Sequence, residues 1–335
     1  MLKDLLEKQQ PVVYRALQNA LQNDCLSNAY LFTGPYGTIK HEAAILLAES
    51  IFCEKQEGFA CEACNTCRRV REGLYGDLVV LDGSKKAVSK ADVDSIQEKF
   101  SRTALENPDG KRVYIIENAE TASIAAQNSM LKFLEEPGRG VTAILTTDNM
   151  SRLLPTIISR CTILPFVPQS SEAYEELAME AGIPEDDAYL VSRVVRKADD
   201  IVPFYEGEEY KRAVGMLKQY LNLEGMPRDE LLVDYDISWK IGGEKEKAKK
   251  ANIDLLNAFF DLMLTYCRDI IAHTGKGPMW YREAVKNTKM SEHDSAKLIM
   301  IVSEQKDKVN RFNDMNLLMA QTFLRLEDFN NERKL

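Results

Sequence analysis

The chain has 335 residues, a length typical of two or three domains, and 45% of them are hydrophobic, which excludes a disordered or collagen-like protein. The formal net charge of −9 argues against binding to nucleic acid by this chain alone, because such binding depends largely on neutralising phosphates. The sequence has no run of 18 apolar residues, and Lys3 and Asp4 come too early for a signal peptide. We therefore expect a soluble, cytoplasmic protein without a membrane partner.

The first predicted elements lead into a glycine-rich turn. Residues 4–22 have amphipathic helical spacing, interrupted by Pro11, which favours the first turn of a new helix. Residues 28–33 form a β-prone run, the turn follows at 34–37, and residues 40–52 again have helical spacing. Strand, glycine-rich turn and helix in this order are typical of a phosphate-binding loop.

Four of the seven cysteines follow that helix at close spacing, as Cys53, Cys61, Cys64 and Cys67. Reduced, unconnected thiols are the simplest interpretation for a cytosolic chain. Two consecutive CxxC steps, however, curl the backbone so that thiolates face one tetrahedral ion, and this favours structural zinc. Four thiolates fill the coordination shell, so the metal would stabilise an insertion and would not hydrolyse a substrate. We expect the isolated cysteines to be core residues: Cys25, Cys161 and Cys267.

Further along the chain, short apolar runs alternate with helix-length segments, as in a parallel α/β sheet covered on both faces. The four runs are 77–81, 113–116, 142–147 and 162–166. From about residue 168 the strand pattern stops, and helical spacing covers 170–205, 206–221, 251–273 and 291–329. Residues 222–250 are irregular and end in a charged run, which indicates a solvated linker.

The phosphate loop has lost residues that its chemistry requires. Gly34, Gly37 and Lys40 remain, but Ile39 stands where the loop needs its second glycine, and His41 replaces the hydroxyl that holds Mg²⁺. We therefore expect a vestigial loop and no ATP binding, with residual nucleotide binding through Lys40 as the alternative.

The strand at 113–116 carries a second defect. It leads into Glu117 and Asn118, where a nucleotide-hydrolysing site has an Asp-Glu pair. An amide cannot orient or deprotonate a water as a carboxylate can. The sequence thus predicts a nucleotide-binding fold without nucleotide hydrolysis.

Several motifs resemble the bacterial clamp-loader subunits of the AAA+ class. They are the four-cysteine insertion behind the loop helix, Glu117-Asn-Ala-Glu, the run Ala126-Gln-Asn-Ser-Met-Leu-Lys-Phe-Leu-Glu-Glu-Pro137, and Ser159-Arg160-Cys161. The motifs cover residues 28–166 densely, whereas the second half of the chain matches loosely.

The resemblance implies an AAA+ α/β P-loop domain over 1–167 with a parallel sheet and a zinc-knuckle insertion at 53–67. A small helical lid domain over 168–205 and an all-α collar domain over 206–335 would follow. It also implies a ring of five subunits, with tau/gamma and delta subunits as partners, that places a sliding clamp on primed DNA. Such a ring is a component of the replicative DNA polymerase holoenzyme.

By motif match, Arg160 is the arginine that one subunit supplies in trans to the ATP site of its neighbour; an interface salt bridge is the alternative. The degenerate loop favours a non-hydrolysing scaffold within this family. Two other functions remain open: an ATP-hydrolysing subunit of the tau/gamma type, and a zinc-knuckle adaptor outside replication.

Overall fold

The computed structural model describes residues 1–55, 58–100, 105–136, 138–221, 245–309 and 315–332. The chain divides into two compact units, Met1–Gln169 and Ser170–Leu335. Most of the charged linker predicted at 222–250 lies outside the described residues, and the described chain resumes as a helix at Lys245. The division of the second unit into lid and collar stays a prediction.

The first unit is built on a parallel sheet whose strands lie in the order β2-β3-β4-β1-β5. The strands are β1 Ala29–Thr33, β2 Leu78–Asp82, β3 Arg112–Glu117, β4 Val141–Thr147 and β5 Thr162–Pro165. All four pairings are parallel, and the register aligns Thr33 at the end of β1 with Thr147 at the end of β4. The predicted parallel α/β sheet is confirmed.

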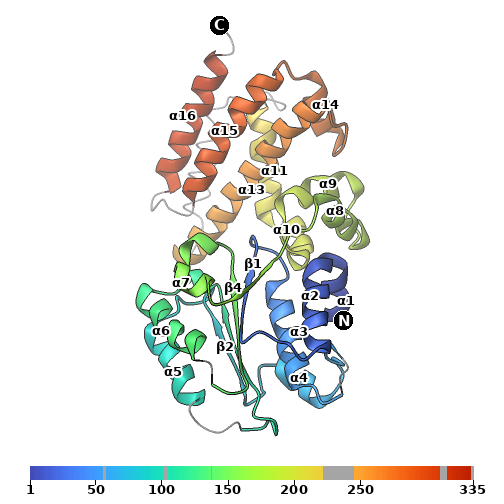
Figure 1. The fold of residues 1–335 in the computed structure, drawn as a ribbon. Coiled ribbons are helices and arrows are strands. Elements are labelled where there is room, and N and C mark those ends of the chain that lie inside the picture. Colours follow the sequence, from blue (N-terminus) through green and yellow to red (C-terminus); the bar gives the residue numbers. More distant parts are fainter. Residues whose placement is uncertain (56–57, 101–104, 137, 222–244, 310–314, 333–335) are drawn as a thin grey trace. The chain divides into compact units, whose positions relative to one another are not determined.

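Helices cover both faces of this sheet (Figure 1), and successive residues of β1 alternate between the two cores. One face packs against α1 Leu2–Gln9, α2 Pro11–Gln22, α3 Lys40–Phe52 and α4 Asn65–Arg71. The other packs against α5 Lys90–Phe100, α6 Ile124–Glu135 and α7 Pro155–Ile158. Tyr30 and Phe32 point into the first core, and Leu31 points into the second. Because both faces of the sheet are buried, the strands consist of continuous apolar runs.

Every regular element described in the second unit is a helix. The helices are α8 Ser171–Glu180, α9 Glu185–Val194, α10 Ile201–Glu206, α11 Glu208–Tyr220, α13 Lys245–Ala272, α14 Met279–Asn287, α15 Glu292–Val309 and α16 Met315–Glu332. Their buried side chains form one core around α13. Within it, Asp269 of α13 accepts hydrogen bonds from Tyr189 of α9 (2.8 Å) and from Tyr281 of α14 (2.6 Å). This buried carboxylate joins three helices, and its burial raises its pKa.

One sequence prediction differs from the structure. Cys25, expected in the core, is exposed on the turn after α2, while Cys267 is buried and Cys161 is half-buried. The helical spacing predicted over 291–329 corresponds to α15 and α16. No helix among the described residues is long and apolar enough to cross a membrane.

Candidate functional site

The glycine-rich turn lies at the carboxyl end of β1, the edge where parallel α/β sheets bind ligands. The amide of Gly34 donates a hydrogen bond to the carbonyl of Thr147 (3.2 Å), and Phe166 donates to Thr33 (2.7 Å). A Cβ at Gly34 would lie 2.4 Å from the carbonyl oxygen of Phe166, so no side chain fits there. Gly37 has a φ of 89°, which favours glycine. Both glycines therefore keep the shape of a phosphate loop.

The lysine of this loop is bound by its own chain. The ammonium group of Lys40 donates to the carbonyls of Gly34 (2.7 Å) and Pro35 (2.9 Å) and to the hydroxyl of Thr38 (2.8 Å). It also forms an ion pair with Asp148 at 2.9 Å. The Lys40 side chain is only 7% exposed. The charge of Lys40 is thus balanced by loop oxygens and by Asp148. In an active loop the lysine binds phosphate oxygens instead.

At the position of the hydroxyl that would hold Mg²⁺, a histidine contacts a carboxylate of the same chain. Nδ1 of His41 contacts Oε1 of Glu117, and this contact raises the pKa of the imidazole above its usual value. A protonated His41 places a cation beside Glu117, where a metal would sit in an active site. Ile39, at the position of the missing glycine, has a φ of −74°, and its side chain is buried in the core.

Asn118 and the end of β4 complete the site. Asn118 has a φ of 49°, and its amide donates to the hydroxyl of Thr146 at 3.1 Å. Its side chain reaches Asp148 at 3.5 Å, and the amide of Asp148 donates to Glu120 at 2.9 Å. The hydroxyl of Thr147 accepts from the amide of Asn149, so it caps the strand end. The polar groups at this edge of the sheet are therefore hydrogen-bonded to one another.

Asp148 was missed at the sequence level. It follows β4 directly, but only the parallel pairing of β1 with β4 brings that strand end beside the phosphate loop. A single sequence does not specify this pairing.

Arg160 lies away from the loop, just after the short helix α7. Its guanidinium donates through one end to the carbonyl of Thr156 (2.9 Å), and its other end pairs with Glu135 at 2.7 Å. The side chain is 34% exposed. Within the described residues its polar contacts are to α6 and α7 and to neighbouring Ser159, and none is to the phosphate loop. The structure therefore does not bring Arg160 together with Lys40.

The four predicted cysteines do come together. The Sγ atoms of Cys53, Cys61, Cys64 and Cys67 all lie within 4.8 Å of one another. The sulfur of Cys67 is 3.4 Å from that of Cys64 and 3.9 Å from that of Cys61. A tetrahedral zinc ion holds its sulfur ligands about 3.8 Å apart, because Zn–S bonds are about 2.3 Å. The spacing fits a metal ion such as zinc.

The environment of these thiols also suits a cation. Hydrogen bonds from the backbone amides of Ala63 and Cys64 lower the pKa of Cys61 to about 6, so this sulfur is a thiolate at neutral pH. Burial raises the pKa values of Cys53 and Cys67. A divalent ion would displace the protons from the buried thiols, which links metal binding to proton release.

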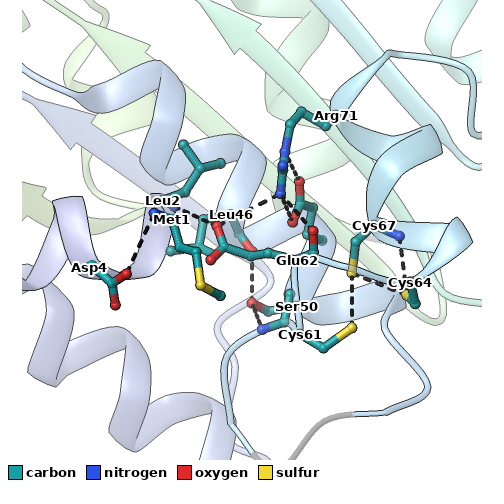
Figure 2. A network of polar contacts seen from close by, with 12 residues as sticks. Met1, Leu2, Asp4, Leu46, Ser50, Cys61, Glu62, Cys64, Cys67 and Arg71 are labelled. Carbon is teal, nitrogen blue, oxygen red and sulfur yellow. Dashed lines mark hydrogen bonds and ion pairs between the residues drawn. The ribbon is translucent and has the colours of Figure 1, made fainter.

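A polar network surrounds the cysteine cluster (Figure 2). Arg71 of α4 donates to both carboxylate oxygens of Glu49, at 2.9 and 3.0 Å, and Glu49 is fully buried in α3. Glu62 accepts a hydrogen bond from the amide of Leu2 at 2.6 Å. The insertion is thereby attached to both α3 and the first helix.

Comparisons with known proteins find a family model that covers most of the first unit, and several relatives. A family model described as "DNA polymerase III, delta subunit" matches residues 9–170. DNA polymerase III subunit delta' of Bacillus subtilis is 39% identical over 201 residues, which are 60% of this chain and 60% of that protein. Subunit delta' of Pseudomonas aeruginosa is 30% identical over 241 residues, 64% of this chain and 71% of that protein. Subunit tau of Bacillus subtilis is 36% identical over 167 residues, 48% of this chain and 28% of that protein. The match to the Bacillus subtilis delta' relative spans less than two thirds of its length.

Proposed function

Because this chain belongs to the family of DNA polymerase III delta-prime subunits, we propose that it is a non-hydrolysing clamp-loader subunit that supplies Arg160 in trans to a neighbour's ATP site. Its partners are the tau/gamma and delta subunits of a five-subunit cytoplasmic ring, which loads a sliding clamp onto primed DNA. The chain meets DNA only within that ring, as its net charge of −9 suggests.

One contrast carries the proposal: the loop's own cation is buried, whereas Arg160 is accessible. Lys40 would have to leave two carbonyls, a hydroxyl and a carboxylate to reach a phosphate. Arg160 is 34% exposed and would give up only one ion pair and two weaker contacts. An ATPase of the tau/gamma type would need the reverse arrangement, with its lysine free to bind nucleotide.

An arginine suits this role for a physical reason. Its planar guanidinium donates two parallel hydrogen bonds to phosphate oxygens and keeps its charge at any physiological pH. Charge that builds on the transferred phosphoryl group is stabilised by such a donor, and arginines supplied in trans can be worth about 10³–10⁵ in rate. Retaining Arg160 would therefore benefit a neighbouring subunit even though the chain's own loop is degenerate.

We assign structural zinc to the cysteine cluster, with Cys53, Cys61, Cys64 and Cys67 as ligands. Bound there, zinc supplies a closed tetrahedral link and no open position for a water. Residues 168–205 would form the lid and residues 206–335 the collar that holds the ring together. The apolar character of the helical core around α13 is consistent with a collar, since such cores support rigid helical assemblies.

The test uses the clamp-loader complex reconstituted with its partners, with wild-type chain, Arg160→Ala or Arg160→Lys. Gel filtration measures assembly, and phosphate release measures turnover per assembled ring. We expect both variants to assemble and to lose turnover, because a lysine cannot reproduce the planar fork. The isolated wild-type chain should release no phosphate.

An interface salt bridge predicts the opposite pattern: weaker assembly, normal turnover per assembled ring and partial rescue by lysine. Unchanged turnover per ring with Arg160→Ala would refute the arginine role.

A further inference from the structure

Arg160 has a carboxylate partner that the family resemblance did not identify. Oε1 of Glu135, the last residue of α6, lies 2.7 Å from one terminal nitrogen of the guanidinium. The other terminal nitrogen donates to the carbonyl of Thr156 in α7. Leu134 and Ile157 are buried in the same core, so the two helix ends are held at a fixed separation. The ion pair between Arg160 and Glu135 thus connects the end of α6 to the end of α7, and both helices are packed in the core.

The position of Glu135 is unfavourable without a cation nearby. The carboxyl end of a helix carries partial negative charge, so an acidic side chain is destabilising there. α6 nevertheless ends in Glu135 and is followed by Glu136 at its C-cap, and both side chains are exposed. Among the described residues, only Glu135 of these two has an ion pair. Arg160 offsets the charge of the Glu135 carboxylate but not that of Glu136. Glu136 therefore serves as a control for Glu135.

The carboxylate also resembles the group that Arg160 would bind in a neighbour's site. A carboxylate and a phosphate both present anionic oxygens to the planar edge of a guanidinium, and the two compete for the same donors. Glu135 is 51% exposed, so an approaching phosphate can replace it without burying an unpaired charge.

We propose that Glu135 is a positioning residue that holds Arg160 within its own chain until a neighbour's ATP replaces the carboxylate. This proposal rests on the proposed role of Arg160 and adds a regulation of that site. Glu135 opposes engagement of the arginine, so it favours the held position of Arg160 when no nucleotide is present next door. The opposition is modest, because an exposed ion pair is weak and is screened by salt.

The experiment compares reconstituted rings that carry wild-type chain, Glu135→Gln, Glu136→Gln or Arg160→Ala. Glutamine keeps the size of the side chain and removes its charge. For Glu135→Gln we expect the KM for ATP to fall about two- to five-fold, the range that an exposed ion pair supports, with the change carried by KM and not by kcat. Glu136→Gln removes the same charge from the same helix end and should leave the KM within a factor of about 1.5 of wild type.

Binding of a non-hydrolysable ATP analogue gives a second readout. Its affinity for the ring should rise by the same factor in Glu135→Gln, and this gain should vanish when Glu135→Gln is combined with Arg160→Ala. A merely structural role for Glu135 would change the unfolding midpoint without changing the KM.

The failures are distinguishable. If Arg160→Ala rings hydrolyse ATP normally, the proposed function is wrong, and the role of Glu135 falls with it. If Arg160→Ala abolishes turnover while Glu135→Gln leaves the KM unchanged, raises it, or acts like Glu136→Gln, only the role of Glu135 is overturned.

Discussion

Single residues explain how this loop keeps the shape of a phosphate loop while its polar side chains bind partners within the chain. Lys40 carries a charge that an active site directs to phosphate, and His41 stands where an active site has the hydroxyl that holds Mg²⁺. Here Asp148 pairs with Lys40 and Glu117 contacts His41 within the chain. The ion pair of Lys40 removes the penalty of a buried, unpaired charge, and it stabilises the loop without a bound ligand.

Lys40 therefore has a structural role that can be measured. Lys40→Met keeps most of the apolar stem but leaves Asp148 and two loop carbonyls without their donor. We expect the first unit to lose about 1–3 kcal/mol of unfolding free energy, the cost of a buried group without its partner. Urea denaturation measures it, with Lys132→Met, an exposed lysine of α6, as the control.

A double-mutant cycle with Asp148→Asn sharpens the result, since coupled residues give less than the sum of the single losses. Equal stability of Lys40→Met and Lys132→Met would show that Lys40 is not held as described.

How far the sequence predicts these residues depends on how local the signal is. The substitutions Ile39 and His41 are visible in one continuous loop, and the retained Arg160 is visible in a short motif of its own. Lys40, His41 and Arg160 find their partners Asp148, Glu117 and Glu135 on other elements, and only strand pairing and helix packing bring them close. Sequence spacing therefore predicted the defect in the loop but not the ion pairs that accompany it.

At the scale of elements, α3 connects the two features of the first unit. It begins at Lys40 in the phosphate loop and ends beside Cys53 of the cysteine cluster, and most of its residues are buried. Glu49 lies in its buried part and is balanced by Arg71 of α4, the helix that begins inside the insertion and ends just after it. The cysteine cluster therefore supports the helix that begins at the phosphate loop.

The range of α3 matches its predicted range, because apolar side chains at helical spacing lie between a glycine-rich turn and a cysteine. The helices α4 and α5 were not predicted. α4 has seven residues and its position depends on the cysteines, and α5 is mostly polar apart from the buried Val93, Ile96 and Phe100. A helix as short as α4 is decided by tertiary contacts rather than by local sequence pattern.

Zinc content tests the insertion. Purified chain should carry about one zinc ion, and Cys64→Ser should lose it. Because the metal links only residues near 53–67, protease cleavage should increase in that segment while the sheet keeps its unfolding midpoint within a few degrees. Metal-free protein with four freely reactive thiols would contradict a zinc site.

Arg71 should stabilise the junction between α3 and α4. Arg71→Gln leaves the buried carboxyl of Glu49 without its cation, so we expect a loss of about 3 kcal/mol in unfolding free energy at pH 7. Burial already raises the pKa of Glu49, and losing Arg71 raises it further. A raised folded-state pKa makes the neutral acid the stable form, so the loss should shrink as the pH falls from 7 toward 5.

Urea denaturation at several pH values measures this dependence. Arg68→Gln is the matched control, because Arg68 is an exposed arginine on the same helix whose side chain bonds only to Asn65 among the described residues. A loss that is independent of pH, or equal in the two variants, would show that Glu49 does not depend on Arg71.

The whole molecule combines a fold for binding nucleotide with a site that its own side chains fill. Its first unit keeps the parallel sheet and the loop, and its second unit supplies a helical core, each with a separate hydrophobic interior. In the proposed function, such a chain contributes to catalysis through what it presents to other subunits. The proposed contribution is Arg160, restrained by Glu135 until a neighbour binds ATP.

The most direct test titrates this chain into a fixed amount of its ATP-hydrolysing tau/gamma partner and measures phosphate release. We predict that the wild-type chain raises turnover per partner subunit, and that Arg160→Ala, assembled to the same extent, gives a rise at least about tenfold smaller, since several seams share the full effect of an arginine supplied in trans. An equal rise in turnover with the wild-type chain and with Arg160→Ala would contradict the proposed role of Arg160.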